Sequence, residues 1–285
     1  TTPRGASIAY NADGSKVYIT DNFNTLVRVY DTSNNTQIGS PITVGTAPHS
    51  NAYRPGTNEV WLDNSSDDTL SVINTTSDTV IHTYAVASGP NGLVFSPDGE
   101  TAYVGVNTAG GSIAVIDADT GTTTDTIGGS AIAEVLIMSS DGSTLYASHP
   151  NTNTVDVFDT TSATLTDTIT VGTGPWGMAL NNDNSRLYVT NPNLLGGLNG
   201  TTISVVDTAS NTVSSTITPS GGAPFFIYAA PPESATDTAS FTVTSTASAR
   251  LADTGDSQQT LTILALIILG VGLTSGLYII KSRYM

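Results

Sequence analysis

The chain has 285 residues, with 24 acidic and 8 basic side chains, a formal net charge of −16 and no cysteine. Such a surface repels nucleic acid, and the absence of cysteine excludes disulfides, thiolate catalysis and cysteine-ligated metals. The acidity favours solubility in a salty extracellular medium, with calcium capture by Asp/Asn loops as the alternative.

A short apolar strand with one aromatic residue recurs along the chain. The aromatic residues are spaced by 43, 42, 43 and 42 positions, and they are Tyr18, Trp61, Tyr103, Tyr146 and Tyr188. A period in the forties is typical of propellers and solenoids. The repeat therefore sets the organisation of the chain.

Each repeat has the same order of parts. A Gly/Thr/Pro-rich lead precedes an apolar first strand, and a tight turn such as Asp98-Gly99 joins it to the aromatic second strand. Third and fourth strands follow, for example Val155–Asp159 and Leu165–Val171. Four strands joined by short turns describe a propeller blade. The sequence predicts an all-β fold, a β-propeller of four-stranded antiparallel blades.

The predicted propeller occupies residues 1–230. Five blades are visible, at about 1–47, 48–89, 90–131, 132–174 and 175–223, with a closing first strand at 224–230. A lone first strand needs three further strands from upstream, whereas this chain itself opens on a first strand. We therefore expect N-terminal blade material and a signal peptide to be missing. A closed five-blade ring with a spare strand is the alternative.

The last part of the chain differs in composition. Residues 231–260 are rich in Thr and Ser and are predicted to form a stalk. Residues 261–280 carry no charge and are long enough to span a bilayer as one transmembrane helix. Basic residues flank this segment closely only on its C-terminal side, where they are Lys281 and Arg283. Residues 281–285 are therefore expected in the cytoplasm and the propeller outside.

The repeats resemble the YVTN family of β-propellers, which occurs in surface-layer and other exported prokaryotic proteins. The resemblance covers about residues 1–228. It rests on Tyr188-Val189-Thr190-Asn191 and its four relatives, on steps such as Val205-Val206-Asp207-Thr208, and on the Gly-x-x-Pro leads. The resemblance implies the propeller fold and an exported protein, but no particular activity, because propellers have many functions.

The residues before the apolar segment resemble an LPXTG-type cell-wall sorting signal. They are Leu251, Ala252, Asp253, Thr254 and Gly255, with Ala252 where the usual motif has Pro. The resemblance implies that a sortase-type transpeptidase cuts between Thr254 and Gly255 and transfers Thr254 to an envelope amine. Retention as a single-span membrane anchor is the alternative.

First strands line the central channel of a propeller, so the residue after each lead Pro is expected at the channel mouth. These candidate binding residues differ between repeats and are Arg4, His49, Asn91, Trp176 and Phe225, with Ala133 where the lead lacks Pro. Leads and the loops after the aromatic strands should share one outer face. That face adds Phe23 and an insertion containing Leu194 and Leu195.

Catalytic and metal signals are sparse. Neither a zinc-protease nor a haem motif is present, and no catalytic residue is assigned. Acidic propeller lactonases are the nearest enzymatic comparison, and Arg4, His49 and Glu134 are the charged groups placed for such chemistry. Asp/Asn clusters such as 64–68 and 181–184 favour hairpin turns, with Ca²⁺ binding as the alternative. No other cofactor is expected.

Together these patterns predict a propeller displayed on the extracellular face of a prokaryotic cell, anchored to the wall or membrane. We expect it to bind a protein or glycan at the cell surface or to serve as a structural envelope protein. The alternative is an extracellular propeller enzyme of the lactonase or hydrolase type. Charged residues clustered at the channel would favour the enzyme, and an apolar outer face would favour the binding protein.

Overall fold

The computed structural model describes residues 5–108, 110–193, 199–220, 224, 226–228 and 278–280. All elements assigned in these residues are β-strands. The chain divides into two compact units, Thr1–His149 with Val155–Thr168, and Pro150–Thr154 with Ile169–Met285. We describe each unit by itself.

The first unit contains four antiparallel sheets. Thr154 and residues 169–170, which lie at the ends of two strands of the fourth sheet, are counted with the second unit. Sheet 1 contains β1 (Gly5–Tyr10), β2 (Lys16–Asp21), β3 (Leu26–Asp31) and β4 (Gln37–Thr43). Sheet 2 contains β5 (Pro48–Arg54), β6 (Glu59–Asn64), β7 (Thr69–Asn74) and β8 (Thr79–Ala85). Sheet 3 contains β9 (Leu93–Phe95), β10 (Thr101–Val106), β11 (Ser112–Asp117) and β12 (Thr122–Gly128). Sheet 4 contains β13 (Leu136–Met138), β14 (Thr144–His149), β15 (Thr154–Asp159) and β16 (Thr164–Thr170).

The second unit contains sheet 5 and a two-stranded sheet. Sheet 5 contains β17 (Met178–Leu180), β18 (Arg186–Asn191), β19 (Thr202–Asp207) and β20 (Thr212–Ile217). The small sheet pairs β21 (Phe226–Tyr228) with β22 (Tyr278–Ile280). Each of the five large sheets joins its strands in chain order, which confirms the prediction of four-stranded antiparallel blades.

The aromatic strand is the second strand of every sheet, and its side chains alternate between two faces. Tyr18 is completely buried and lies with Val60 and Leu62 in the core between sheets 1 and 2. Trp61 has the same role between sheets 2 and 3, where its ring meets Phe95 edge-on at a centroid distance of 5.4 Å. Alternation with period two thus gives each sheet two apolar faces.

Tight turns after the first strands have the predicted chemistry. In the Asp98-Gly99 turn, the Asp98 carboxylate accepts a 3.0 Å bond from the Glu100 amide. Gly99 has a φ of +75°, and an added Cβ would lie 2.3 Å from the Pro55 carbonyl of sheet 2. Glycine is therefore needed both for its backbone conformation and for the close approach of two sheets.

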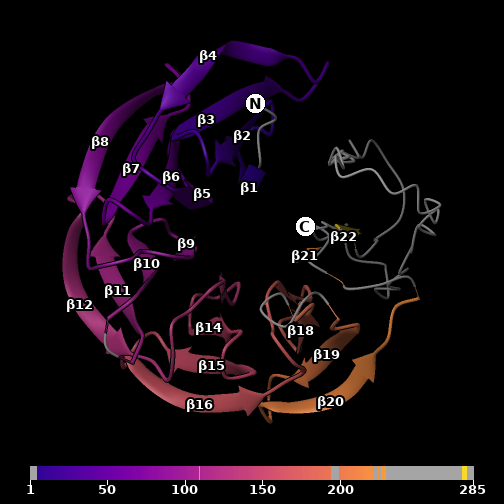
Figure 1. Ribbon diagram of the computed structural model, residues 1–285. Coiled ribbons are helices and arrows are strands. Elements are labelled where there is room, and N and C mark those ends of the chain that lie inside the picture. The colour runs from indigo at the N-terminus through magenta and orange to yellow at the C-terminus, as the bar shows by residue number, and fades with distance from the viewer. Residues whose placement is uncertain are drawn as a thin grey trace, which may run out of the picture. The chain divides into compact units, whose positions relative to one another are not determined.

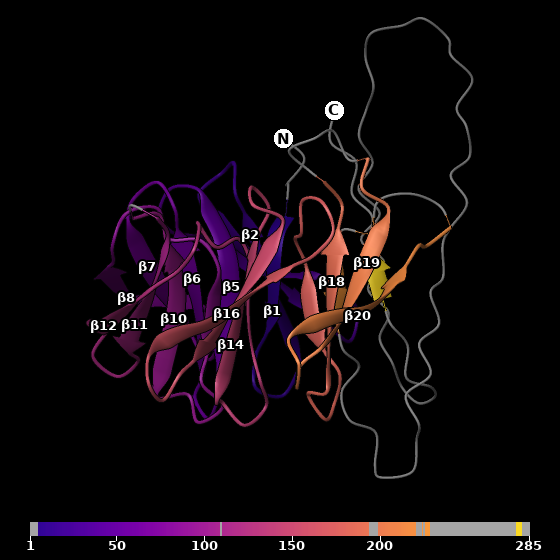
Figure 2. The same cartoon turned by 90° about the horizontal axis from the view of Figure 1, so that it is seen from below.

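The first strands of the first unit are neighbours in chain order, β1 beside β5, β5 beside β9 and β9 beside β13. They lie innermost in Figure 1, and the fourth strands β4, β8, β12 and β16 lie outermost. The turns gather at two opposite ends of the sheets (Figure 2). Loops after second strands share an end with the leads, because Asn22 bonds to the Pro48 carbonyl and the Ser65 amide to the Ala47 carbonyl.

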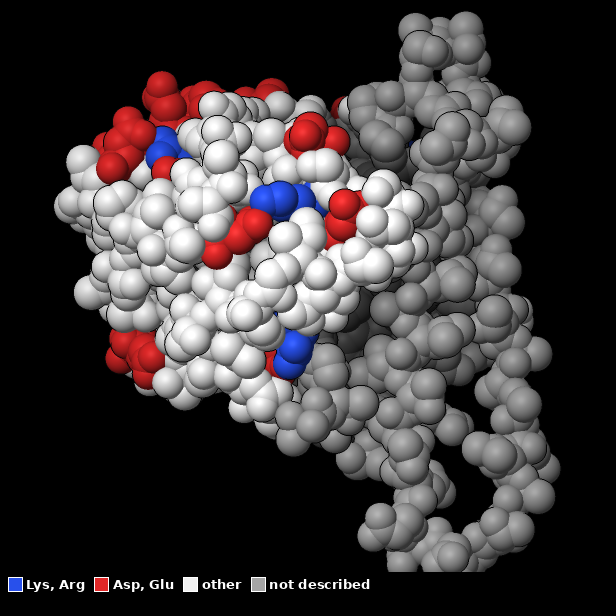
Figure 3. Space-filling model, turned by 90° about the horizontal axis from the view of Figure 1, so that it is seen from above, with Lys and Arg blue, Asp and Glu red and all other residues white. Residues whose placement is uncertain are grey.

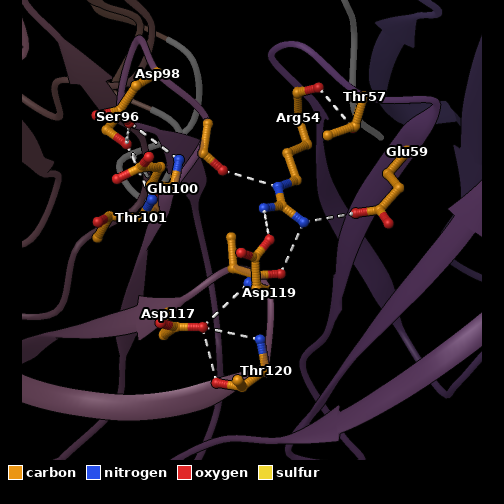
Figure 4. Close-up of polar contacts among 12 residues, drawn as sticks. Arg54, Thr57, Glu59, Ser96, Asp98, Glu100, Thr101, Asp117, Asp119 and Thr120 are labelled. Atoms are coloured by element: carbon orange, nitrogen blue, oxygen red, sulfur yellow. Dashed lines mark hydrogen bonds and ion pairs between the residues drawn. The ribbon is translucent and has the colours of Figure 1, made fainter.

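A buried arginine links sheets 2 and 3. Arg54 ends β5, and its guanidinium donates to the carbonyls of Gly99 at 2.8 Å and Ala118 at 2.9 Å. It also forms ion pairs with Glu59 and Asp119 (Figure 4). Five donors in a planar fork suit this convergence of carbonyls and carboxylates.

The surface carries both signs of charge within a mainly uncharged area. On the face shown in Figure 3, basic side chains lie beside acidic ones. The pairs of Lys16 with Asp78 at 2.7 Å and Arg186 with Asp207 at 2.9 Å are of this kind. The excess of acidic groups is therefore distributed over turns.

The predicted stalk, the sorting signal and most of the predicted transmembrane segment lie outside the described residues. The described part of that segment, Tyr278–Ile280, is not helical: it forms strand β22 along β21. Among the residues that the structure describes, there is no apolar helix of the length needed to span a bilayer.

Candidate functional site

Residues from three leads come together at the inner strands of the first unit. His49 lies at the start of β5, Asn91 just before β9 and Glu134 just before β13. His49 and Asn91 were predicted for the channel mouth, and Glu134 directly follows the predicted position Ala133, which is 1% exposed. Contacts between β5, β9 and β13 bring the three together.

The three side chains form a connected polar group. The Asn91 Nδ2 donates to Glu134 Oε2 at 3.0 Å. His49 Nε2 lies 3.8 Å from Glu134 Oε1, and His49 Nδ1 lies 3.4 Å from the Ser50 hydroxyl. The side chains of His49 and Glu134 are 28% and 17% exposed, so the group is mostly enclosed but reachable from solvent.

A second carboxyl group, that of Asp63, bonds to the backbone of the lead that carries His49. Asp63, on β6, is fully buried and accepts hydrogen bonds from the backbone amides of His49 and Ser50, each at 3.2 Å. The backbone of Gly92 also donates to it. We name His49, Asn91, Glu134 and Asp63 the inner-strand cluster.

Burial dominates the electrostatics of the cluster. It raises the pKa of Glu134 to about 7, against the opposing effect of the Asn91 hydrogen bond. Burial also raises the pKa of Asp63 to about 8, although the backbone amides oppose this rise. The pKa of His49 is lowered by burial, while Asn91 acts in the opposite direction. The cluster therefore changes its charge near neutral pH, a property common at functional sites.

The leads of sheets 3, 4 and 5 hold their residues in the same way. The amides of Asn91 and Glu134 donate to the carbonyls of Gly105 and Ser148, and in sheet 5 the Trp176 amide donates to the Thr190 carbonyl. Trp176 is therefore equivalent, within its own sheet, to Asn91. It belongs to the second unit, so it is not placed with the cluster.

The other predicted site residues lie apart or outside the description. Phe23, in the turn between β2 and β3, is 67% exposed. Gly5 pairs with Asp21 in sheet 1 as Pro48 pairs with Asn64 in sheet 2. Ala6 is therefore the residue of sheet 1 that is equivalent to His49. Residues outside the described part are Arg4, Leu194, Leu195, Phe225, Leu251, Ala252, Asp253, Thr254 and Gly255.

Sequence reasoning missed Asp63 as a member of the site. Asp63 is the last residue but one of the aromatic strand, where an Asp ordinarily indicates that a polar turn is about to begin. A usable signal was present, because the equivalent positions in the other repeats are Thr20, Gly105, Ser148 and Thr190. A carboxylate at a position otherwise given to small neutral residues is distinctive.

The Asp/Asn clusters considered for Ca²⁺ have structural partners in turns. Asp67 accepts from the Thr46 amide at 2.6 Å, and Asp68 from the Gly89 amide at 2.7 Å. Asp183 accepts from the Ser185 amide at 3.0 Å. In the described ranges, no three His, Cys, Asp or Glu side chains are grouped to hold a metal ion.

The stacked four-stranded sheets and their inner strands define the chain as a β-propeller protein. The family model described as lactonase, 7-bladed beta-propeller, matches residues 6–194, and the chain belongs to this family. The described residues contain five four-stranded sheets.

Two known proteins are similar to the chain. The uncharacterized protein YncE of Salmonella typhi is 33% identical over 102 residues, which cover 35% of this chain and 28% of that protein. The matched part is thus less than a third of that relative. The hydrazine synthase of Kuenenia stuttgartiensis is similar in structure, with a TM-score of 0.59 and 18% identity over 79% of this chain and 89% of that chain. This likeness concerns the fold alone.

Proposed function

We propose that this protein is a cell-surface propeller that binds a small polar ligand, or a polar group of a larger glycan or protein, at the inner-strand cluster. The observation that carries the proposal is the convergence of His49, Asn91 and Glu134 from three sheets. The apolar cores between the sheets do not require polar residues at these positions. Divergence within an otherwise regular repeat favours a binding role.

The chemistry of the cluster indicates how a ligand would be held. Glu134 accepts hydrogen bonds from hydroxyl or amine groups in its ionised form and donates one when protonated. Asn91 fixes one of its oxygens, which leaves Oε1, beside His49, for the ligand. Precise polar contacts in a partly enclosed site are typical of small-molecule recognition.

The test is a binding screen on the full chain by amide NMR, with D-glucono-1,5-lactone and N-acetylglucosamine as probes. We expect shifts concentrated at the amides of His49, Ser50, Asn91 and Glu134, and their loss in Glu134→Gln. Thr166→Ala, on the exposed strand β16, is the control that keeps binding. Shifts spread over the whole surface, or binding unchanged by Glu134→Gln, would refute the site.

A lactone-hydrolysing enzyme is the second candidate, favoured by the family and by the pKa of about 7 at Glu134. In this reaction Glu134 removes a proton from water as the water oxygen bonds to the ester carbonyl carbon. The ring C–O bond then breaks, and the proton passes to the departing oxygen, giving one hydroxy acid. A general base contributes about 100-fold or more to such a rate.

Hydrolysis of D-glucono-1,5-lactone, followed as acid release at constant pH, tests this candidate. Glu134→Gln should lower the rate above background about 100-fold, with Thr166→Ala unchanged. Binding without a rate above background would leave the binding function and reject the enzyme.

The proposal includes display outside a prokaryotic cell. It is supported by the uncharged segment 261–280, the basic residues after it and the motif 251–255, which together match a sorting signal in order. A sortase-type transpeptidase would then be a partner, and the membrane the alternative anchor. Intact mass of the protein released from the cell surface tests this, because sorting requires a C-terminus at Thr254.

A further inference from the structure

In four of the five large sheets a side chain near the end of the second strand accepts a hydrogen bond from the amide 13 residues earlier in the chain, and sheet 3 has Gly105 at this position. The hydroxyls of Thr20, Ser148 and Thr190 accept from the first-strand amides of Ser7, Val135 and Gly177. In sheet 2 the acceptor is the carboxylate of Asp63, which bonds to the Ser50 amide with the same spacing of 13 residues. Only sheet 2 thus has an acid at this position among the five large sheets.

We propose that Asp63 is a positioning residue of the inner-strand cluster, which fixes the backbone of the two leads that carry His49 and Asn91. The inference rests on the proposed function only for the role of the cluster in ligand binding. The positioning of the backbone is a property of the free protein. Asp63 does not contact the solvent, because it is fully buried.

A carboxylate makes contacts that the hydroxyl of the other sheets does not make. Its Oδ1 lies 3.2 Å from the amides of both His49 and Ser50, and its Oδ2 lies 3.2 Å from the Ser50 amide. The Gly92 amide, from the lead into sheet 3, is a further donor. Asp63 therefore ties together the two leads that carry His49 and Asn91.

The charged and titratable groups around Asp63 are few. His49 lies on β5 and Glu134 precedes β13, and the charge of Glu134 acts on Asp63. Two buried carboxyl groups that interact do not ionise independently, because the charge of one opposes the charge of the other. Glu134 has the lower pKa, about 7 against about 8, so it ionises while Asp63 is still neutral, and its charge then opposes the ionisation of Asp63.

The experiment follows the free full chain by NMR over a range of pH, in Asp63→Asn and Asp63→Thr. Asp63→Asn keeps the shape and removes the charge, and Asp63→Thr introduces the residue of sheets 1 and 5. In both variants we expect the midpoint of the Glu134 side-chain carbon signal to rise by up to about one pH unit, because the Asn91 hydrogen bond that lowers the Glu134 pKa is weakened when its lead loses the Asp63 carboxylate. The His49 ring signals should also move, because the ring loses its backbone support.

Thr190→Ala is the matched control, because it removes the equivalent bond to the Gly177 amide in sheet 5 without touching a charge. We expect it to lower the melting temperature and to leave the Glu134 and His49 titrations unchanged. If Asp63→Asn also lowers only the melting temperature and leaves both titrations in place, Asp63 is merely structural and the inference is wrong.

Ligand binding separates this inference from the proposed function. With D-glucono-1,5-lactone or N-acetylglucosamine as the probe, Asp63→Thr should weaken binding about tenfold, more at one end of the pH range than at the other. Shifted titrations without any binding in the parent protein would support Asp63 as a positioning residue and refute the proposed ligand site. Unshifted titrations with intact binding would have the opposite meaning.

Discussion

The His149 ring meets the Asp156 carboxylate inside sheet 4, with Nε2 3.0 Å from Oδ2 and the side chains 1% and 0% exposed. His149 Nδ1 lies 2.8 Å from the Ile132 carbonyl. Burial acts to raise the pKa of Asp156, but bonds from His149 and Ser130 hold it below its usual value.

Every large sheet has a pair of matched residues at the two positions that His149 and Asp156 occupy in sheet 4. The third-strand member in each case lies diagonally across the strand ladder from the second-strand member. The pairs are Asp21 with Arg28, Asn64 with Ser71, Val106 with Ala114, His149 with Asp156 and Asn191 with Ser204. Depending on the sheet, these two positions thus hold an ion pair with the acid on the second or the third strand, an amide–hydroxyl pair, or an apolar pair.

We predict that sheet 4 accepts the pair found in sheets 2 and 5. Asp156→Ser takes the carboxylate away from the buried His149 ring nitrogen and from the Ser130 amide, and should cost about 1–3 kcal/mol in the free energy of unfolding. The double variant His149→Asn with Asp156→Ser should recover about 1 kcal/mol of this loss, because residues in contact are coupled. Urea denaturation of both singles and the double measures the coupling, and simple additivity would contradict the prediction.

The repeat made the fold predictable from the sequence, but not the pairings. Alternating apolar residues and Asp-Gly turns depend on local chemistry, so strands such as β10 and β14 follow from the sequence alone. His149 and Asp156 meet through the register of β14 and β15, which a strand pattern does not specify. The pattern at the position of Asp63 was visible, but only the register shows that its carboxylate faces two leads.

The candidate site was partly predictable for a similar reason. The residue after the lead Pro was predicted for the channel mouth, and in the structure His49 lies at the start of β5 and Asn91 just before β9. In sheet 1 the register makes Ala6 the residue equivalent to His49. The contact of Glu134 with Asn91 depends on the packing of β9 beside β13.

Arg54 and Lys16 each bond to a backbone carbonyl of another sheet, but they should differ in their effect on stability. Lys16 bonds to the Thr75 carbonyl at 2.9 Å, as Arg54 does to the Ala118 carbonyl. The Arg54 side chain is 10% exposed and that of Lys16 21%. We expect Arg54→Ala to cost about 3–5 kcal/mol, because it leaves buried acceptors unpaired, and Lys16→Ala about 1 kcal/mol.

Arg54→Lys is the informative companion variant. A lysine keeps the charge but cannot donate to two carbonyls and two carboxylates in one plane, so most of the loss should persist. Chemical denaturation of the three variants measures this. An Arg54→Lys protein as stable as the parent would show that charge alone links the sheets.

Tyr10 and Phe95 are equivalent aromatic residues at the ends of first strands β1 and β9. Phe95 is 6% exposed and packs on Trp61 of the neighbouring sheet, whereas Tyr10 is 47% exposed. Phe95→Ala should cost about 3–5 kcal/mol, since it opens a cavity between sheets 2 and 3. Tyr10→Ala should cost about 1 kcal/mol or less, because half of the ring is already in contact with solvent. Equal losses in thermal or urea unfolding would contradict this comparison.

Glu134 should make the stability of the protein depend on pH around neutrality. Its pKa is about 7 in the folded chain, against an ordinary value of 4.5 for a glutamate side chain. The folded state therefore binds more protons than the unfolded state between these values, and stability present below pH 4.5 is lost as the pH rises through about 7. Glu134→Gln, which stays neutral, removes this loss. We expect the variant to gain roughly 2 kcal/mol relative to the parent between pH 5 and pH 8.

Asp141→Asn is the control, because hydrogen bonds from Ser139 and Ser143 lower the pKa of Asp141 to about 2 and its charge is constant in this range. Urea denaturation at both pH values decides the matter: a Glu134→Gln difference that does not change with pH would show that the carboxyl titrates alike in the folded and unfolded chains.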